Sequence, residues 1–195
     1  MLIYNGEKLF KCKEVLDMKI YIVGSISSGK STLAQKMSKS LGCLYQLLDE
    51  IVYISDKTNP WGNRKRPIEE RDNLFYSVIQ QPSWIIEDTG RPCFDVGLKM
   101  ADTIILLEIS PRLRNYRIIK RWIKQRLGIE KCIYKPRYKM LKCMLQWSKD
   151  YDEGKENLKD RIFPYKEKVI TLKNNKDIHV FLEHCRIART RLKFI

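Results

Sequence analysis

A glycine-rich loop carries the clearest chemical pattern in this sequence. Residues 24–31 read Gly-Ser-Ile-Ser-Ser-Gly-Lys-Ser and match the pattern G-x-x-x-x-G-K-[ST]. The backbone N–H groups of such a loop point inward and bind phosphate, assisted by the positive end of the helix that follows. The pattern therefore predicts a site for ATP and Mg²⁺ in which Lys30 reaches the β- and γ-phosphates and Ser31 ligates the metal. The predicted phosphate-binding residues are Gly24, Ser25, Ile26, Ser27, Ser28, Gly29, Lys30, Ser31 and Thr32.

Two pairs of acidic residues follow short apolar segments of the kind that form buried strands. Asp49 and Glu50 follow residues 44–48, and Glu87 and Asp88 close the segment that begins at Trp84. A carboxylate at such a place can hold a Mg²⁺-bound water or accept a proton from a nucleophile. We expect Glu87 or Asp88 to serve the metal, and the sequence leaves open which of these acids or Asp49 acts as base.

Several arginines are candidates for contacts with anionic groups. Arg91 comes directly after the second acidic pair and could clamp the anion of an acceptor substrate in a bidentate way. Arg117 and Arg121 share a helix face with Arg114 and could stabilise the phosphoryl group in transit, or else form an ordinary basic surface. The turn-rich run Arg64, Lys65 and Arg66 could close on a phosphate or be a solvated charge run.

Strands and helices alternate along the chain, and this order predicts a parallel sheet covered on both faces. Apolar, partly β-branched runs predict strands at 19–23, 44–48, 84–87, 103–107 and 168–172. Helical patterns are predicted at 30–41, 68–81, 111–127, 136–149, 150–163 and 176–188. Functional groups of such sheets gather at the carboxyl ends of the strands, which is where the glycine loop and both acidic pairs fall.

The 195 residues predict a single domain over 18–190, preceded by an extension of residues 1–17. Within the domain, residues 54–82 form an acceptor-side insert. Residues 117–140 form a helical lid, because Gly128 and Pro136 interrupt two helix-forming stretches there.

The overall charge of +15 predicts an anionic partner, such as a small acceptor substrate, a nucleotide or a nucleic acid. The six cysteines include no C-x-x-C pair, and the sequence has neither a membrane-spanning apolar run nor a signal-peptide pattern. We therefore expect a cytoplasmic monomer without a membrane partner.

These segments together resemble the DNA topology modulation proteins, an adenylate-kinase-like branch of P-loop proteins. The resemblance rests on KIYIVGSISSGKSTLA, LLDEIVY, RPIEERDNLF, SWIIEDTGRP, the block from ADTIILLEIS to RLGIEK, YKPRYKMLKCMLQW and KVITLKNNKDI, and it covers about residues 18–180. In two places the chain departs from the family pattern. Asp88 stands where the family usually has glycine, and Tyr53 stands where it more often has tryptophan.

The resemblance implies an α/β three-layer P-loop NTPase fold whose five parallel strands are arranged in the order 2-3-1-4-5, with helices on both faces. It also implies ATP-dependent phosphoryl transfer of the nucleoside monophosphate kinase type. It assigns the phosphate cradle to 24–32, the acceptor-side acid to Asp49, the metal-side acid to Glu87, the acceptor arginine to Arg91, and the lid arginines to Arg117 and Arg121.

Two other functions fit the same sequence. The basic stretch 112–142 would suit a nucleic-acid-binding regulator of DNA topology that uses ATP as a switch. A kinase that acts on polynucleotide 5′ ends would combine the two functions. The identity of the acceptor is encoded by no motif, because selectivity depends on the shape of a pocket.

Overall fold

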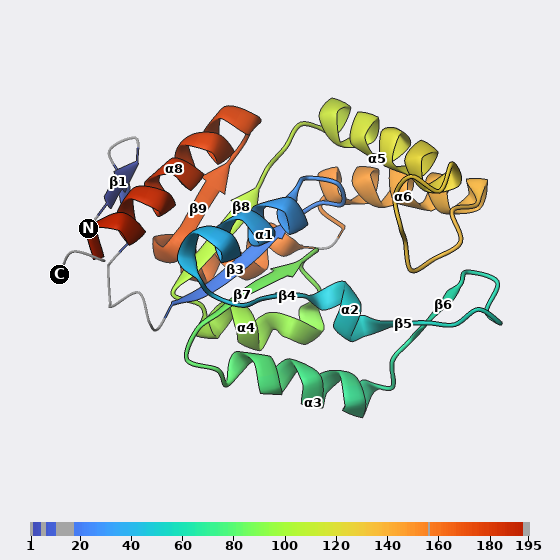
Figure 1. Cartoon of the computed structure of the whole chain (residues 1–195), viewed down its shortest axis with the longest axis horizontal. Coiled ribbons are helices and arrows are strands. Elements are labelled where there is room, and N and C mark those ends of the chain that lie inside the picture. Colours follow the sequence, from blue (N-terminus) through green and yellow to red (C-terminus); the bar gives the residue numbers. More distant parts are fainter. Residues whose placement is uncertain (1, 5–6, 11–17, 156, 193–195) are drawn as a thin grey trace.

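The structure is a computed structural model that describes residues 2–4, 7–10, 18–155 and 157–192. Its centre is a five-stranded, fully parallel sheet with the order β4-β7-β3-β8-β9 (Figure 1). The strands are β3 (Lys19–Gly24), β4 (Tyr45–Leu47), β7 (Trp84–Asp88), β8 (Thr103–Leu107) and β9 (Val169–Leu172). Numbered along the chain, these five strands have the order 2-3-1-4-5, so the expected P-loop NTPase architecture is confirmed.

Alternating side chains of the strands build a separate apolar core on each face of the sheet. Ile20 and Ile22 of β3 pack with α1 (Lys30–Leu41) and α8 (Asn175–Leu192). Tyr21 and Val23 point the other way, because successive side chains of a strand face opposite sides. That second face is covered by α2 (Leu48–Val52), α3 (Ile68–Ile79), α4 (Asp95–Met100) and α7 (Leu158–Ile162).

A helical hairpin stands beside these layers and includes residues 117–140, for which the sequence predicts a lid. It consists of α5 (Pro111–Arg126) and α6 (Tyr138–Asp152), joined by residues 127–137 (Figure 1). Pro111 begins α5, as the sequence predicts, and Gly128 follows its end with a φ of 69°. Ile118, Met140, Leu141 and Met144 form a small core of its own between the two helices.

The buried Arg114 ties the start of α5 to the end of α6. Its guanidinium donates to the carbonyl oxygens of Ile109 and Ser148 at 3.0 and 3.1 Å and to Asp152 Oδ2 at 2.5 Å. The side chain is only 2% exposed. Arg114 is therefore a structural residue of the hairpin, although it shares a helix face with Arg117 and Arg121.

Four short elements were not predicted, namely α2, α4, β5 and β6, and one predicted helix is wrong. The helix α2 follows β4 directly, α4 precedes β8, and β5 (Tyr53–Ser55) pairs with β6 (Asn63–Lys65) inside the acceptor-side insert. The helix expected over 150–163 does not form as one unit, because α6 runs on to Asp152. The chain then turns at Gly154, whose φ is 72°, before α7 and a 3₁₀ segment, Phe163–Lys168.

Near the N-terminus, β1 (Leu2–Tyr4) and β2 (Glu7–Phe10) form an antiparallel pair, and β1 lies beside α8 (Figure 1). Residues 11–17 of the expected extension lie outside the described part. Among the described residues, no helix combines the length and apolarity that crossing a membrane requires.

Candidate functional site

The glycine loop leaves the central strand β3 and leads into α1, as the sequence predicts. Gly24, Gly29 and Ser27 have φ values of 145°, 105° and 56°, so the chain reverses through the left-handed region. A Cβ on Gly24 would come within 2.6 Å of the Leu107 carbonyl oxygen in the neighbouring strand β8. Only glycine therefore fits this first position of the loop without displacing the sheet.

Polar groups of the loop converge on the space it encloses. The Lys30 side chain is 5% exposed, and its Nζ donates to the Ser25 carbonyl oxygen across the loop at 2.9 Å. Within the described part of the chain, the buried hydroxyls of Ser25, Ser27 and Ser28 have no hydrogen-bond partner. Buried hydroxyls without partners are costly, so three of them in one loop suit a site whose ligand supplies the missing acceptors.

The first residue after Lys30 meets the acid at the end of β7. Ser31 Oγ donates to Glu87 Oε2 at 2.7 Å, which joins the two predicted metal-side residues. Glu87 is 5% exposed, and burial raises the pKa of its carboxyl, although the charge of Lys30 and the hydrogen bond from Ser31 act in the opposite direction. A hydroxyl and a carboxylate that meet beside a phosphate loop are oxygen ligands of the type that Mg²⁺ prefers.

The predicted acceptor-side residues also meet, but as a compact ion cluster. Arg91 forms salt bridges with Asp49 through Nη2 and with Asp88 through Nη1. Its guanidinium carbon also lies 6.0 Å from the centre of the Tyr53 ring. Burial alone would lower the pKa of Arg91, but Asp88 and then Asp49 raise it above its usual value.

The turn that carries Arg91 is held from two sides. Asp88 Oδ2 accepts the backbone N–H groups of Gly90 and Arg91 at 2.7 and 2.5 Å. From α7, Arg161 donates to the Gly90 carbonyl oxygen and pairs with Asp95. A Cβ on Gly90 would come within 2.7 Å of the Leu158 side chain, so α7 packs directly on this turn.

The two predicted lid arginines occupy different places. Arg117 Nη1 donates to the Ser28 carbonyl oxygen at 2.8 Å, so this arginine lies on the outside of the glycine loop. Arg121 turns toward α6, where Nη2 lies 3.8 Å from Met144 Sδ and Nε has no partner among the described residues. The structure thus brings Arg117, but not Arg121, into contact with the loop.

The basic run in the acceptor-side insert does not act as one group. Arg66 Nε donates to the Ile51 carbonyl oxygen at 2.8 Å, and its guanidinium pairs with Glu70. Arg64 lies 3.8 Å from Asp56 and is about half exposed, while Lys65 is exposed. Arg66 therefore fastens the insert to α2 and α3.

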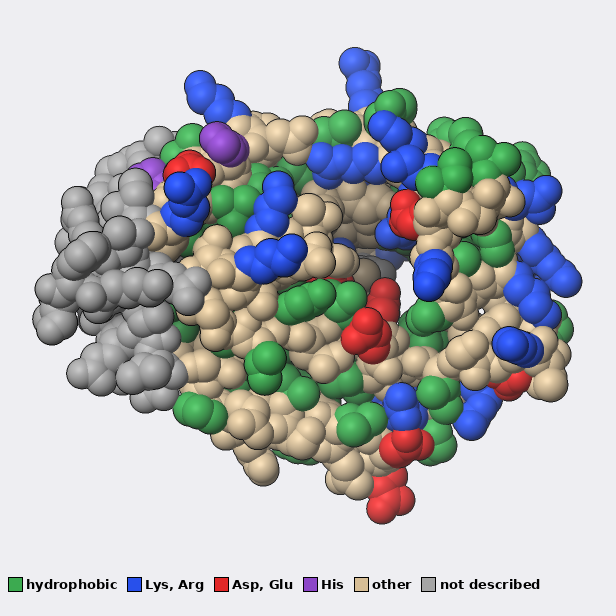
Figure 2. Space-filling view, in the orientation of Figure 1, with side chains coloured by type: hydrophobic (Ala, Val, Ile, Leu, Met, Phe, Trp, Pro, Cys, Tyr) green, Lys and Arg blue, Asp and Glu red, His purple; other side chains and the backbone are tan. Residues whose placement is uncertain are grey.

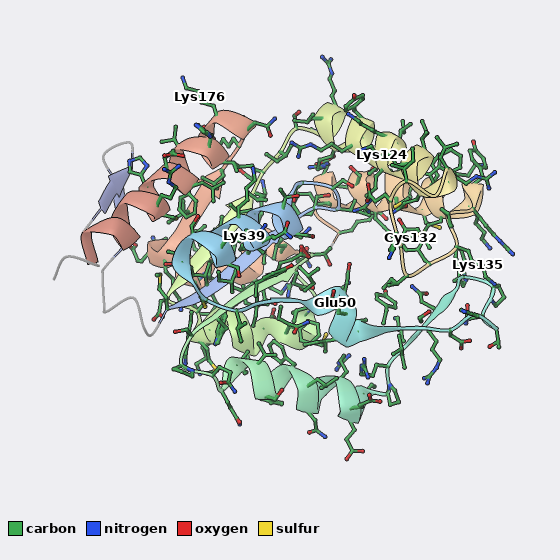
Figure 3. All side chains as sticks on the ribbon, viewed as in Figure 1. Lys39, Glu50, Lys124, Cys132, Lys135 and Lys176 are labelled. Atoms are coloured by element: carbon green, nitrogen blue, oxygen red, sulfur yellow. The ribbon has the colours of Figure 1, made fainter. Side chains whose placement is uncertain are left out.

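The lid loop touches the acceptor-side insert across the mouth of the site. The Lys135 backbone N–H donates to the Trp61 carbonyl oxygen at 2.7 Å, and Lys135 Nζ contacts the Lys57 and Asn59 carbonyl oxygens at 3.2 and 3.1 Å. Figure 3 shows Lys135 where the lid loop meets the β5–β6 hairpin. Trp61 and Ile26 of the glycine loop also pack against the α5–α6 core, so the lid contacts both sides of the site.

A hollow lies between these parts of the molecule. Figure 2 shows it between the α5 side and the α2 side, with basic side chains on the former rim and acidic side chains on the latter. Figure 3 shows the side chain of Glu50 rising from α2 toward this space. On the α2 side, Asp49 pairs with Arg91, which also pairs with Asp88.

Sequence reasoning missed the interactions that fix the acceptor side. The pairing of Asp88 with Arg91, the ring of Tyr53 and the support from Arg161 all link segments that are separate in the sequence or in different elements. The only sequence signal for this arrangement is Asp88 itself, an acid where the resembled family usually has glycine.

Comparisons with known proteins find similar structures but no similar sequence. No family model matches the chain, and no curated protein matches it. The DNA topology modulation family therefore stays a prediction.

Three solved structures illustrate the structural likeness. A gluconokinase from Sinorhizobium meliloti 1021 is 11% identical, with a TM-score of 0.47. The alignment covers 91% of this chain and 94% of the gluconokinase chain. A shikimate kinase from Bacteroides thetaiotaomicron is 14% identical, with a TM-score of 0.49, and the alignment covers 89% of this chain and 98% of the shikimate kinase chain. A deoxyadenosine kinase from M. mycoides is 18% identical, with a TM-score of 0.45, and the alignment covers 90% of this chain and 98% of the deoxyadenosine kinase chain. At such identities, the function has to be inferred from this chain's own residues.

Proposed function

We propose that this chain is an ATP-dependent phosphotransferase that moves the γ-phosphoryl group of ATP to a small acceptor. The observation that carries the proposal is the hydrogen bond from Ser31 to Glu87, formed at the mouth of a loop whose serine hydroxyls lack partners. The DNA topology modulation proteins remain the proposed family on the sequence segments that resemble them.

The residues of the loop fit a nucleotide triphosphate with its metal. The three unpartnered hydroxyls of Ser25, Ser27 and Ser28 can donate to phosphate oxygens, and the start of α1 supplies a positive dipole end. Lys30 bonds a carbonyl oxygen of its own loop, and a phosphate oxygen would be a stronger, charged acceptor for the same ammonium group. Ser31 and Glu87 would hold Mg²⁺, which supplies charge neutralisation at the β- and γ-phosphates.

Each residue then has a distinct task in the transfer. Lys30 stabilises the negative charge that spreads over the γ-phosphoryl oxygens, and Arg117 supports the loop from outside through the Ser28 carbonyl oxygen. Asp49 lies on α2 with about half of its side chain exposed, so it can accept the proton of an acceptor hydroxyl. Arg121 has a free Nε and lies in the lid, so it can turn toward the transferring group when the lid moves.

The proposal is tested by measuring ATP binding and then ATP consumption in the presence of candidate acceptors. We expect binding of a non-hydrolysable ATP analogue with Mg²⁺ to raise the melting temperature, since a ligand that binds only the folded state stabilises it. We also expect ADP formation that depends on an acceptor. A protein that neither binds the analogue nor forms ADP with any nucleoside, nucleotide or sugar would contradict the proposed function.

A further inference from the structure

The acceptor side of the site is more acidic than an anion-binding pocket should be. Asp49 and Asp88 pair with the guanidinium of Arg91, and Glu87 accepts a hydrogen bond from Ser31 at the end of the glycine loop. The exposed Glu50 lies on the same helix as Asp49. The positive groups Lys30 and Arg117 belong to the loop that would hold ATP.

From this charge division we propose that the acceptor is an uncharged hydroxyl compound of the nucleoside or sugar class, and that Arg91 positions Asp49 instead of clamping an anion. The proposal rests on the phosphotransferase function above. It departs from the anionic acceptor that the overall charge of +15 predicts. The difference arises because net charge describes the whole surface, whereas an acceptor meets only the local charges of its pocket.

The Nη1–Nη2 end of Arg91, the end that would clamp an anion, is already engaged by two carboxylates. Its two terminal nitrogens pair with Asp49 and Asp88, and the ring of Tyr53 lies over its guanidinium. Bidentate binding of a phosphate or carboxylate needs two parallel N–H groups of one arginine. An anion that binds the Nη1–Nη2 end of Arg91 in this way would have to displace one of these carboxylates.

The pairing of Arg91 with Asp88 is built into the fold. The Asp88 side chain is fully buried and also accepts two backbone N–H groups of the turn that carries Arg91. Arg161 and Leu158 of α7 hold that turn from the other side. Separating the pair would leave a buried carboxylate without its counter-ion, which is strongly unfavourable.

Asp49 is oriented but still accessible. About half of its side chain is exposed (53%), and only its Oδ1 is engaged by Arg91. Its second oxygen can accept the proton of an acceptor hydroxyl. The acceptor O–H bond then breaks as its oxygen bonds to the γ-phosphorus, the bond from that phosphorus to ADP breaks, and the proton moves to Asp49.

The test compares uncharged compounds with their phosphorylated forms. We would measure dissociation constants by calorimetry for thymidine against thymidine 5′-monophosphate, adenosine against AMP, and glucose against glucose 6-phosphate. Saturating non-hydrolysable ATP analogue with Mg²⁺ is present throughout, so that phosphates cannot bind at the glycine loop. In the wild-type protein we expect no phosphorylated compound to bind more tightly than its uncharged partner.

Asp88→Asn supplies the decisive variant. The amide oxygen can still accept the backbone N–H groups of the turn, while the charge that holds Arg91 Nη1 is lost. We expect the phosphorylated compounds to bind at least about 10-fold more tightly to this variant than to wild type, since the freed guanidinium can now pair with a phosphate. Glu50→Gln is the matched control, because it removes one negative charge from the same rim without freeing Arg91.

If Asp88→Asn does not fold, Asp49→Asn supplies a second test of the same proposal. Asp49 is largely exposed and its replacement frees Arg91 Nη2, so tighter binding of the phosphorylated compounds is expected here too. Two outcomes would overturn the proposal. One is wild-type binding that favours the phosphorylated member of a pair, and the other is a gain in the Asp variants no larger than in Glu50→Gln. The stabilisation by the ATP analogue alone is recorded first, so failure of the phosphotransferase function itself is detected separately.

Discussion

At the scale of single residues, the site combines groups that fit phosphate with groups whose burial is unfavourable without a ligand. Lys30 is buried against a carbonyl oxygen of its own loop, and the buried hydroxyls of Ser25, Ser27 and Ser28 have no partner among the described residues. Glu87 is buried with a raised pKa. Arrangements of this kind are typical of functional sites, because a bound ligand or metal supplies the interactions that the buried groups lack in the free protein.

Lys30→Ala should reduce turnover by about 10²–10³-fold, because one preorganised positive group at the transferring phosphoryl is lost. The melting temperature should change little, since the loss of a buried side chain is offset by the removal of a buried charge. The measurement is ADP formation under saturating substrates, with Lys36→Ala on the exposed side of α1 as the control. Near-wild-type turnover in a folded variant would mean that the loop does not take part in transfer.

Glu87→Gln should raise the melting temperature of the ligand-free protein and weaken its use of Mg²⁺. The raised pKa means that the folded state holds this proton more tightly than the unfolded state, so the contribution of Glu87 to the free energy of unfolding falls as the pH rises above its ordinary pKa of 4.5. Without ligand, the variant should therefore melt at a higher temperature than wild type near about pH 7, and the two should converge near about pH 4. The amide can still accept the Ser31 hydroxyl.

The same variant should lose Mg²⁺-dependent activity by about 10-fold or more, since an amide is a weaker ligand than a carboxylate for a hard cation. Melting curves at the two pH values and a Mg²⁺ titration of turnover check both parts. An unchanged Mg²⁺ requirement would remove Glu87 from the metal site.

At the scale of elements, the lid and the acceptor-side insert are joined. Lys135 caps the turn of the β5–β6 hairpin through three hydrogen bonds, and Gly62 lets the chains approach closely, because a Cβ there would come within 2.9 Å of the Lys135 nitrogen. The Trp61 ring packs against the α5–α6 core and carries Lys139 Nζ 5.1 Å from its centre. The two elements should therefore move together.

Lys135→Ala should uncouple the two elements, because it removes the contacts of Nζ with the Lys57 and Asn59 carbonyl oxygens. Hydrogen exchange should become faster in both 57–62 and 127–137, whereas Lys131→Ala, an exposed lysine of the same loop, should leave both segments unchanged. In the wild-type protein a non-hydrolysable ATP analogue should slow exchange in both segments at once. Slower exchange in 127–137 alone would show that the lid moves independently.

At the scale of the whole molecule, the positive charge is concentrated in the lid. Residues 111–149 contain thirteen lysines and arginines and one acid, Glu130. Some of these cations form hydrogen bonds within the protein, namely Arg114, Arg117 and Lys135. The outer face of α5 mixes exposed cations with exposed apolar side chains, namely Arg112, Tyr116, Ile119, Lys120, Ile123 and Lys124.

We therefore expect binding to polynucleotides to be weak and governed by salt. Exposed cations on one helix face can neutralise phosphates whatever the base sequence, so log affinity should fall linearly with log salt and be lost by about 0.2 M salt. Fluorescence anisotropy with single- and double-stranded DNA between about 50 mM and 200 mM salt provides the measurement. Affinity that survives at the upper end, or that depends on sequence, would favour the nucleic-acid-binding regulator.

The individual strands and the phosphate loop could be predicted from the sequence, because each depends on residues that are neighbours in the chain. An apolar strand, a glycine loop and an amphipathic helix follow one another within residues 19–41, and each depends on neighbours in the chain. The same holds for the acids at the strand ends. Parallel strands place their carboxyl ends at one edge, so Glu87 could be expected beside Ser31 before any contact was seen.

Only the tertiary structure decided how the charges of the acceptor side are paired. Asp49 and Arg91 are 42 residues apart, Arg161 reaches Gly90 from 71 residues away, and Lys135 meets the hairpin across 78 residues. A sequence pattern shows which residues are charged, but pairing depends on distances set by packing between elements. For that reason Arg91 looked like a free anion clamp in the sequence, and three-dimensional packing made it the partner of two carboxylates.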